Sequence, residues 1–385
     1  MKRIVKLGEV CEKIISGGTP KTDRKDFWNG SIPWITSADI QGNAEISPKK
    51  FITPEAVSAS ATNVLPKGNV IVVTRVGLGK VAKTTEDLAF SQDSQGLILK
   101  STVDAGYLVH CLSKKVQRFK EVARGATIKG VTRDDLISIQ IPLPELAEQQ
   151  RIAALLNHAD RLRHLDRQLL ARYDDLAQSL FLDLFGDPVG NEKGWEMRKL
   201  DDLCKKITVG FVGTCEKFYT DSSGIPLLRT GNLSEDGLVM KNLKYVTKEF
   251  HMKNQKSKVT PGDILIARHG DNGKGCLVGS EITEANTLNV VILRPNHKLS
   301  EPRFILFTLN SQAMRAVVAG KTGGATQKVI NTKAIQALRF PVPPLPLQHR
   351  FADLLAEIEK QKALARQQAA QSEALFQSLL SRSFD

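Results

Sequence analysis

Two glycine-rich segments are the parts of the sequence that most resemble a site for chemistry. GLGKVA at 77–82 and GDNGKG at 270–275 each follow an apolar run. A dinucleotide-binding turn needs a third glycine and a helix whose amides face the phosphates, and the first segment has neither. A phosphate-binding P-loop has a Ser or Thr after its lysine, and the second segment lacks one. We therefore expect both segments to be turns that carry a lysine.

The other titratable side chains also lack the spacing that metal or nucleophilic chemistry needs. His158 and His164 are six residues apart in a helical stretch, so they do not share a helix face. Asp134 and Asp135 precede Leu136 as in the first turn of a short helix, which acidic side chains favour. We find no ATP site and no Asn-Pro-Pro-aromatic or Asp-Pro-Pro-aromatic tetrapeptide, the signature of amino-methyltransferases. The sequence therefore predicts no catalytic residue, no metal site and no cofactor bound by this chain.

Cysteine usage and hydropathy indicate the compartment. The five cysteines are odd in number and include no CxxC pair, which argues for reduced thiols and against a disulfide framework or a structural zinc site. No apolar run approaches the roughly 18 residues that a membrane span needs. The start, MKRIVKLGEVCEKI, has no continuous apolar region of the kind found in secretory signals. We therefore expect a cytoplasmic protein.

The basic charge lies in two separate blocks. The net charge is +13. Lys and Arg outnumber Asp and Glu by 21 to 14 in residues 1–144 and by 22 to 13 in residues 195–343, whereas 145–186 and 344–385 carry no basic excess. Two basic bodies indicate a polyanion that is contacted in two places. A basic surface that serves only solubility explains the charge equally well.

The elements that position these side chains occur twice. Residues 125–156 align without a gap on residues 324–355 with 12 identities in 32 positions, where chance gives roughly two. Three earlier pairs also match, namely KLGEVCEKI (6–14) with KLDDLCKKI (199–207), SIPWITSADI (31–40) with GIPLLRTGNL (224–233), and NVIVVTRVGLGK (69–80) with DILIARHGDNGK (263–274). Between these anchors the halves diverge in sequence and loop length. Variable loops on a constant scaffold are where recognition usually resides.

Within each half, short apolar runs and helical stretches indicate a mixed α/β domain. The runs VIVV, GLIL, DILIA and NVVIL predict buried strands, and residues near 104–122 and 301–319 predict helices. Pro142 and Pro144 are expected to stop the strand that precedes them.

After the prolines of each half, apolar residues recur at alternating steps of three and four, which is a heptad pattern. The first copy has one polar member, Asp166, which would fix the register, and the second copy is more polar. About 38 residues give a helix of roughly 57 Å. We favour an antiparallel coiled coil of the two helices over the alternative that each packs on its own domain. The residues expected to pack between the helices or on a partner are Ile152, Leu155, Leu162, Leu169, Leu176, Phe351, Leu354, Ile358 and Leu375.

Over essentially its whole length, the chain resembles the specificity subunits of type I restriction–modification systems. The resemblance is carried by KLGEVCEKI, by WITSADI, by the GATIKG and GGATQK loops, by PLPELAEQQRIAALL with PVPPLPLQHRFADLL, and by the junction LFGDPVGNEKGWEMRKL. The doubled order of these motifs is more specific than any one of them.

This resemblance implies two tandem mixed α/β target-recognition domains, each reading half of a split, asymmetric DNA site. The long helices between them would form an antiparallel coiled coil in a pseudo-twofold internal repeat, set the spacing and dock two modification subunits. Those partners would carry S-adenosylmethionine and methylate adenine at N6, and restriction subunits using ATP and Mg²⁺ could join through them. The expected parts are target-recognition domain 1 (1–144), a central conserved spacer helix (145–186), a linker (187–194), target-recognition domain 2 (195–343) and a C-terminal conserved spacer helix (344–385).

Residues for contact with double-stranded DNA are selected from aligned loops and one basic loop. For each of them the alternative is an ordinary solvated side chain. The candidates are Lys21, Arg24, Lys25, Arg75, Lys80, Lys129, Arg268, His269, Lys274 and Lys328.

Two other classes of function remain open from the sequence. One is a self-sufficient DNA methyltransferase or nuclease with an unrecognised active site, which would retain S-adenosylmethionine as an isolated chain. The other is a coiled-coil scaffold whose two domains bind something other than DNA.

Overall fold

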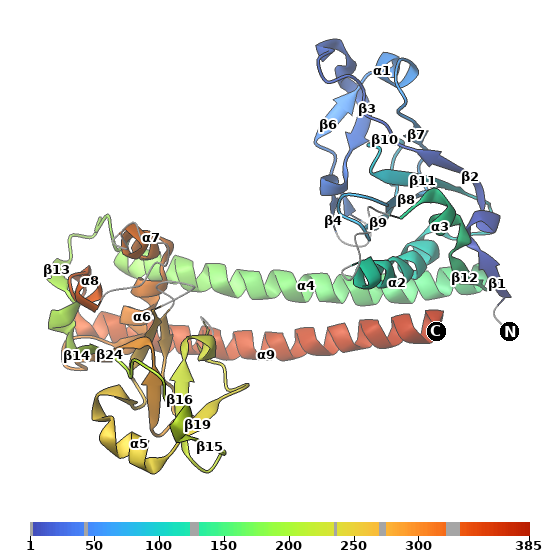
Figure 1. Cartoon of the computed structure of the whole chain (residues 1–385). Coiled ribbons are helices and arrows are strands. Elements are labelled where there is room, and N and C mark those ends of the chain that lie inside the picture. The colour runs from blue at the N-terminus through green and yellow to red at the C-terminus, as the bar shows by residue number, and fades with distance from the viewer. Residues whose placement is uncertain (1–2, 42–44, 124–130, 235–236, 269–274, 321–331) are drawn as a thin grey trace. The chain divides into compact units, whose positions relative to one another are not determined.

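A computed structural model describes residues 3–41, 45–123, 131–234, 237–268, 275–320 and 332–385. The chain divides into two compact units, of which unit 1 comprises residues 1–169 and 365–385 and unit 2 comprises residues 170–364. Two helices of 40 residues each, α4 (Leu146–Phe185) and α9 (Leu345–Phe384), contribute one segment to each unit (Figure 1).

Unit 1 contains twelve strands and three complete helices among its described residues. The strands are β1 (Arg3–Lys6), β2 (Cys11–Ser16), β3 (Trp28–Ile35), β4 (Ile40–Gln41), β5 (Glu45–Ile46), β6 (Lys50–Ile52), β7 (Val64–Leu65), β8 (Val70–Val73), β9 (Val81–Lys83), β10 (Leu88–Phe90), β11 (Ser94–Leu99) and β12 (Gln140–Leu143). The helices are α1 (Pro54–Ser58), α2 (Ala105–Ala123) and α3 (Arg133–Ser138).

Unit 2 repeats much of this order. Its strands are β13 (Glu196–Lys199), β14 (Cys204–Val209), β15 (Tyr219–Thr220), β16 (Ile225–Arg229), β17 (Leu233–Ser234), β18 (Gly237–Leu238), β19 (Lys244–Val246), β20 (Lys258–Val259), β21 (Ile264–Ala267), β22 (Gly275–Leu277), β23 (Ala285–Leu288), β24 (Val290–Pro295) and β25 (Arg339–Val342). Its complete helices are α5 (Lys248–Lys253), α6 (Pro302–Asn310), α7 (Gln312–Gly320) and α8 (Thr332–Gln336).

The sheets of the two units have matching topology. The order β2-β11-β8-β9 in unit 1 corresponds to β14-β24-β21-β22 in unit 2. A second sheet contains one parallel pair in each unit, β3 with β10 and β16 with β23, while its other pairs are antiparallel. A short antiparallel ribbon, β1 with β12 or β13 with β25, joins the first strand of each half to its last. The fold is therefore mixed α/β.

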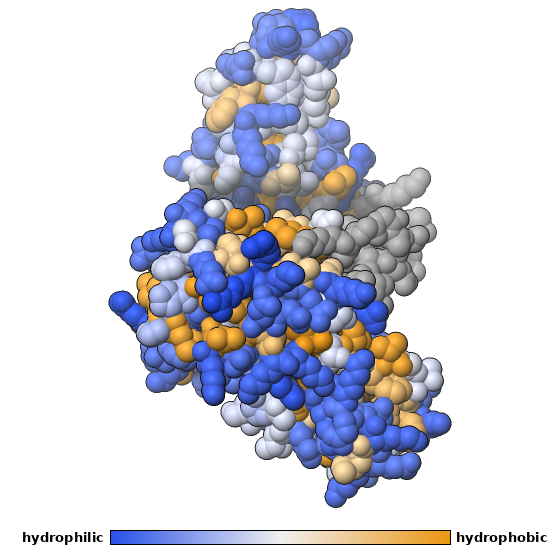
Figure 2. All heavy atoms as spheres, turned by 90° about the vertical axis from the view of Figure 1, so that its left-hand side faces the viewer, coloured by the Kyte–Doolittle hydropathy of each residue, from blue (hydrophilic) through white to orange (hydrophobic). Residues whose placement is uncertain are grey.

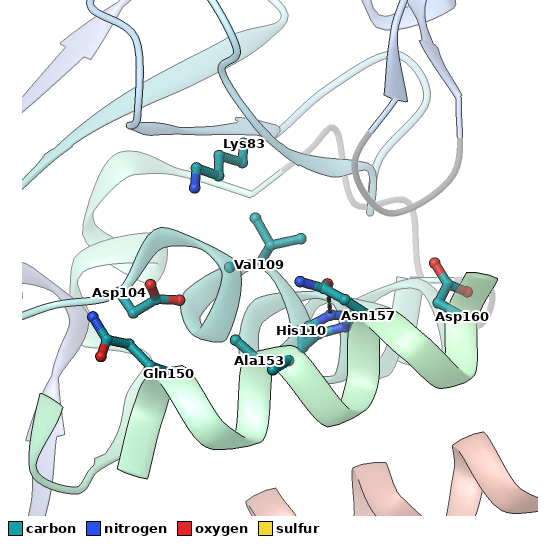
Figure 3. Close-up of a pocket in the computed structure, with 10 residues that line it drawn as sticks. Lys83, Asp104, Val109, His110, Gln150, Ala153, Asn157 and Asp160 are labelled. Atoms are coloured by element: carbon teal, nitrogen blue, oxygen red, sulfur yellow. Dashed lines mark hydrogen bonds between the residues drawn. The ribbon is translucent and has the colours of Figure 1, made fainter. Parts of the chain in front are cut away.

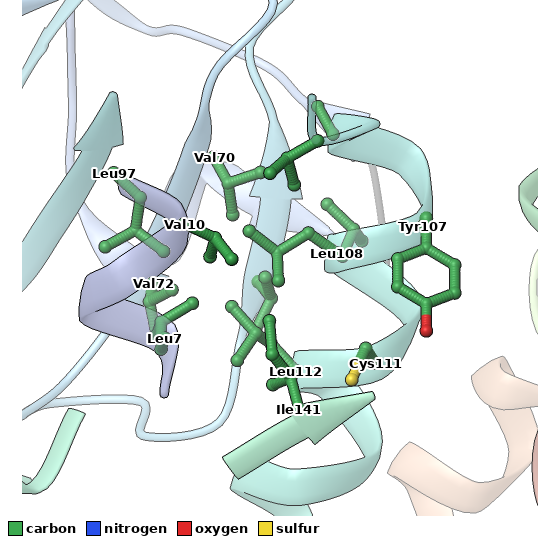
Figure 4. Packing of buried hydrophobic residues seen from close by; sticks show 14 of the residues in the cluster. Leu7, Val10, Val70, Val72, Leu97, Tyr107, Leu108, Cys111, Leu112 and Ile141 are labelled. Atoms are coloured by element: carbon green, nitrogen blue, oxygen red, sulfur yellow. The ribbon is translucent and has the colours of Figure 1, made fainter. Parts of the chain in front are cut away.

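Strand alternation explains why the run VIVV is apolar at every position. Val70 and Val72 of β8 pack in the large core beside α2, which Figure 4 shows. Ile71 and Val73 point the other way, into a second cluster with Phe90. Because successive side chains of a strand face opposite sides, a strand covered on both sides needs apolar residues throughout. Strand β21 of unit 2 follows the same rule.

Within unit 1, the first segment of α4 packs against the last segment of α9. Arg163 Nε donates to Glu373 Oε2 at 2.7 Å, and Gln368 Nε2 donates to Asp166 Oδ1 at 3.0 Å. Residue numbers rise on one helix as they fall on the other, so the two segments run antiparallel. Phe376 and Phe384 of α9 complete the core formed by β1, β8, α2 and α4.

Within unit 2, the last segment of α4 packs against the first segment of α9. Phe181 and Phe351 lie with their ring centroids 5.5 Å apart, and Lys362 bonds to Asp174. These pairs are again antiparallel in residue number. Phe181 and Phe185 also contact Phe304 of α6, so each long helix packs both on the other and on a globular domain.

On each long helix, the inward face and the predicted seam share every other residue. Between these shared residues, the inward side chain is the one that follows the predicted residue. On α4 the inward series is Ile152, Leu156, Ala159, Arg163, Asp166, Leu170, Tyr173, Ala177 and Leu180, and on α9 it is Phe351, Leu355, Ile358, Lys362, Ala365, Ala369, Ser372, Phe376 and Leu379. Leu155, Leu162, Leu176, Leu354 and Leu375 are instead 41–51% exposed. These five leucines do not form the intramolecular seam, and packing against a partner remains a prediction for them.

Leu169 and Ile358 are half-buried, whereas Ile152 and Phe351 are buried. The displacement arises because the second inward residue of each heptad lies four residues after the first, not three. Several of these inward residues are small or polar, as Ala177 and Arg163 illustrate, so hydropathy alone favoured Leu176 and Leu162 beside them.

Local structure departs from expectation at two further points. The helix predicted near 301–319 is two helices, because Ser311 adopts an extended backbone and caps the N-terminus of α7 through Met314 N. Pro142 does not stop its strand, since β12 continues to Leu143. Among the described residues β12 pairs only with β1, and an edge strand tolerates the missing proline N–H.

Candidate nucleic-acid interface

In unit 1 the loop between β8 and β9 lies against the turn that follows β3. The Lys80 Nζ donates to the Ser37 carbonyl oxygen at 2.6 Å. Gly77 has a φ of +82°, and a Cβ there would lie 3.3 Å from Ser37 Oγ. The GLGKVA segment is thus a hairpin turn whose glycine permits close approach to the neighbouring turn.

Backbone hydrogen bonds from two further segments hold this turn in place. Thr74 N and Arg75 N both donate to the Asp93 carbonyl oxygen, at 2.8 and 3.2 Å, and Val131 N donates to the Thr74 carbonyl oxygen at 2.8 Å. Arg75 is exposed, and Val76 beside it is 69% exposed. The arrangement holds one cation and one apolar side chain outward on a fixed backbone, which suits contact with a phosphate or a base edge.

The basic loop before β3 lies elsewhere in the unit. Lys21, Arg24 and Lys25 precede β3, whereas Ser37 follows it, and a strand of eight residues spans on the order of 20 Å. The structure therefore does not bring this basic loop together with Arg75 and Lys80.

Arg24 has an intramolecular partner. Its guanidinium bonds to the Asp26 carboxylate at 2.5 and 2.8 Å and lies over the Phe27 ring. The same hydrogen bonds hold the pKa of Asp26 below its usual value and raise that of Arg24. Lys21 and Lys25 are exposed. Arg24 therefore offers less net charge to a polyanion than the sequence suggested.

In unit 2 two arginines lie at the ends of the strands that correspond to β3 and β8 of unit 1. Arg268 comes directly after β21, and Arg229 ends β16 at the position that aligns with Thr36. Within the described part of the chain, neither Nε atom has a hydrogen-bond partner although both are buried. The preceding residues, Leu228 and Ala267, share one hydrophobic cluster. Sequence reasoning selected Arg268 but missed Arg229, although GIPLLRTGNL marked its position.

Four other candidates lie outside the described residues, namely Lys129, His269, Lys274 and Lys328. They remain predictions from the aligned loops.

The described residues contain no group of three or more His, Cys, Asp or Glu side chains that could hold a metal ion. Across the same residues, no helix combines the length and apolarity required to cross a membrane. Hydrophilic side chains cover most of the face seen in Figure 2, with apolar groups between them.

The chain matches the family model described as "Type I restriction modification DNA specificity domain" twice, over residues 2–172 and 192–373. Among curated proteins, it is 26% identical to the type I restriction enzyme MjaIX specificity subunit of Methanocaldococcus jannaschii over 92% of this chain and 85% of the relative. It is 31% identical to the EcoR124I/EcoR124II specificity subunit of Escherichia coli over 46% of this chain and 45% of the relative.

Solved structures show the same fold at low sequence identity. The type I restriction–modification S subunit from M. genitalium superposes with a TM-score of 0.61 at 14% identity, covering 100% of this chain and 96% of the other. A chain from a structural study of assembly and conformational transition of the type I R-M system superposes with a TM-score of 0.56 at 21% identity, covering 99% and 97%.

Proposed function

Because the chain belongs to the type I restriction–modification DNA specificity family, we propose that it reads a bipartite, asymmetric DNA site with one recognition surface in each half. The chain is a specificity subunit and not itself a catalyst. The proposed parts are the recognition domains 1–144 and 195–343, the spacer helices 145–186 and 344–385, and the linker 187–194.

The proposal of two DNA-recognition surfaces is supported by the strand ends that align between the two halves. In unit 1 the turn after β3 adjoins the loop after the central strand β8 through the bond of Lys80 to Ser37. In unit 2 the strand that corresponds to β3 ends at Arg229, and the strand that corresponds to β8 is followed by Arg268. Arg75 is exposed in the first half, whereas Arg229 and Arg268 of the second half are half-buried, and Arg229 donates to the Asn242 carbonyl oxygen. Cations at such positions contact phosphates or the O6 and N7 acceptors of guanine.

The long helices support a role in spacing and docking. Each packs antiparallel to the other within both units, and each leaves leucines exposed, including Leu155, Leu162, Leu354 and Leu375. Exposed apolar side chains on a charged helix are typical of a protein–protein interface. We assign them to two modification subunits, which would hold S-adenosylmethionine, and restriction subunits with ATP and Mg²⁺ would join through these.

Selection of DNA from a randomised pool tests this function. The chain is assembled with the modification subunit, bound duplexes are recovered, and their sequences are aligned. The expected result is two short defined segments separated by a spacer of constant length and random sequence. A single contiguous motif, or no motif from an assembly that does bind DNA, would contradict the proposal.

A further inference from the structure

Gln92 is an exposed glutamine whose side-chain amide is held by a neighbouring hydroxyl. It lies in the link between β10 and β11 of unit 1, and the Thr19 hydroxyl donates to its Oε1 atom at 2.6 Å. Among the residues that the structure describes, its Nε2 atom has no hydrogen-bond partner. Two N–H donors and one lone pair of Oε1 therefore remain available to a ligand. A hydrogen bond between exposed side chains adds little to stability in water, so its main consequence is to orient this amide.

Two glycines bring Thr19 to the link. Gly18 N donates to the Phe90 carbonyl oxygen at 2.8 Å, so the segment before Thr19 lies beside the end of β10. A Cβ on Gly17 would lie 2.2 Å from the Ser91 carbonyl oxygen, a clash that only glycine avoids. This close backbone approach places the Thr19 hydroxyl within reach of the glutamine.

The same link is shorter in unit 2. Backbone hydrogen bonds from the preceding segment mark its ends at Phe90 and Ser94 in unit 1 and at Thr287 and Val290 in unit 2. The link of unit 2 is therefore shorter by one residue, and its last residue, Asn289, is half-buried with a φ of +56°. The outward glutamine amide is thus a feature of unit 1.

An exposed cation adjoins the link in unit 1. Arg75 N donates to the Asp93 carbonyl oxygen at 3.2 Å, and the Arg75 side chain is exposed. A guanidinium at this place can hold a DNA phosphate or a guanine. The carboxylate of Asp93, one residue after Gln92, disfavours a phosphate beside the amide. The Gln92 amide is therefore better suited to the edge of a base.

The polar hollow between α2 and α4 of unit 1 differs from this link. Figure 3 shows His110 and Asn157 turned toward each other there, with His110 Nε2 2.8 Å from Asn157 Oδ1. Asp160, which also lines the hollow, bonds to Arg163 at 2.9 Å. These polar groups already have partners within the chain, whereas the donors of the link face outward.

We propose that Gln92 reads one adenine of the half-site bound by unit 1. Its Nε2 donates to adenine N7 and its Oε1 accepts from the N6 amino group, which is the pattern that this base presents in the major groove. Thr19 is a positioning residue, since it acts through the orientation of the amide. The inference rests on the proposed function and assigns one base of the DNA target to one side chain.

An adenine analogue in the DNA tests this inference. The chain is assembled with its modification subunit, and each adenine of the selected site is replaced in turn with 7-deazaadenine, which lacks the N7 acceptor but keeps its base pair. Fluorescence anisotropy then measures the Kd of each duplex. For wild type, replacement of one adenine in one half-site should weaken binding about tenfold through the loss of the Gln92 contact.

Gln92→Ala should bind the natural site about tenfold more weakly and lose nothing further when that adenine is replaced. The salt dependence should stay unchanged, because no charge is removed. Gln140→Ala, at an exposed glutamine of β12, is the matched control and should keep the full sensitivity to the analogue. Thr19→Val should bind with a reduced sensitivity, because the amide is then free to turn.

Thermal unfolding checks that each variant is folded, and Thr19→Val carries the test if Gln92→Ala is not. A Gln92→Ala complex that still loses tenfold on replacement of the same adenine would overturn the inference. So would a wild-type complex that is sensitive to no adenine. A wild-type complex that binds DNA but selects no split site would instead overturn the proposed function, and the role of Gln92 with it.

Discussion

The Asp166 carboxylate of α4 accepts a hydrogen bond from the Gln368 side-chain amide of α9 at 3.0 Å, inside the interface between the two helices of unit 1. Asp166 is only 3% exposed, and among the described residues its Oδ2 atom has no hydrogen-bond partner. A buried, partly satisfied charge costs stability, yet a polar pair between two helices fixes their register.

We therefore expect the double substitution Asp166→Leu with Gln368→Leu to raise the free energy of unfolding by about 1–4 kcal/mol. Thermal or urea unfolding measures this. The single variant Gln368→Leu should destabilise the chain, because it leaves the Asp166 carboxylate without its donor. A double variant that is less stable than wild type would show that the pair contributes net stability.

Hydrogen bonds of the Gln149 side chain link the start of α4 to the start of α2. Gln149 is 1% exposed, donates to the carbonyl oxygens of Thr102 and Pro144, and accepts from Asp104 N. Gln149→Leu should lower the free energy of unfolding by about 2–4 kcal/mol, since three part-buried backbone groups lose their partner. Gln150→Leu changes an exposed neighbour and is the control. Equal melting temperatures for the two variants would contradict this account.

Arg75 and Lys80 should affect DNA binding in different ways. Arg75 is exposed, so Arg75→Ala should weaken binding and lower the salt dependence by about one charge. Lys80 donates to the Ser37 carbonyl oxygen, so Lys80→Ala should weaken binding through loss of loop order while the salt slope stays unchanged. Fluorescence anisotropy of the assembled complex at several salt concentrations separates the two. Identical slopes for the two variants would refute the distinction.

Buried thiols should make stability fall in alkali. Burial raises the pKa of Cys11 and Cys276 to about 11 and that of Cys111 and Cys204 to about 12, from an ordinary value of 9.0. The unfolded chain therefore loses these protons first, and the free energy of unfolding should decline as pH rises from 9 to 11. Urea titrations at pH 8, 9 and 10 measure this decline.

Reaction of the same thiols with a disulfide reagent is the companion test. At pH 8 the native chain should react slowly at the buried Cys11, Cys111 and Cys276, and the urea-unfolded chain quickly. Fast reaction of these three thiols in the native chain would contradict their burial.

Much of the fold could be predicted from local patterns in the sequence. Val70 to Val73 predicted a buried strand, which the structure covers on both faces, and Thr132 with Asp135 form the cap of α3 where paired acids predicted a short helix. These features depend on a few neighbouring residues, so one sequence suffices to detect them.

The features that were missed depend on contacts between distant residues. Leu155 and Leu156 are equally apolar, and only the packing of α4 on α2 and α9 decides which of them is buried. The same holds for Arg229, whose Nε atom is buried, and for Arg24, whose charge is shared with Asp26.

The methylome of a clean host tests the central claim most directly. N6-methyladenine is mapped in cells that express this chain alone, its neighbouring methyltransferase alone, or both together. The account predicts a split motif with a fixed spacer that appears only when both proteins are present. Methylation directed by this chain alone would contradict the account, because it would make the chain an enzyme. The same motif from the methyltransferase alone would also contradict it, because the chain would then specify nothing.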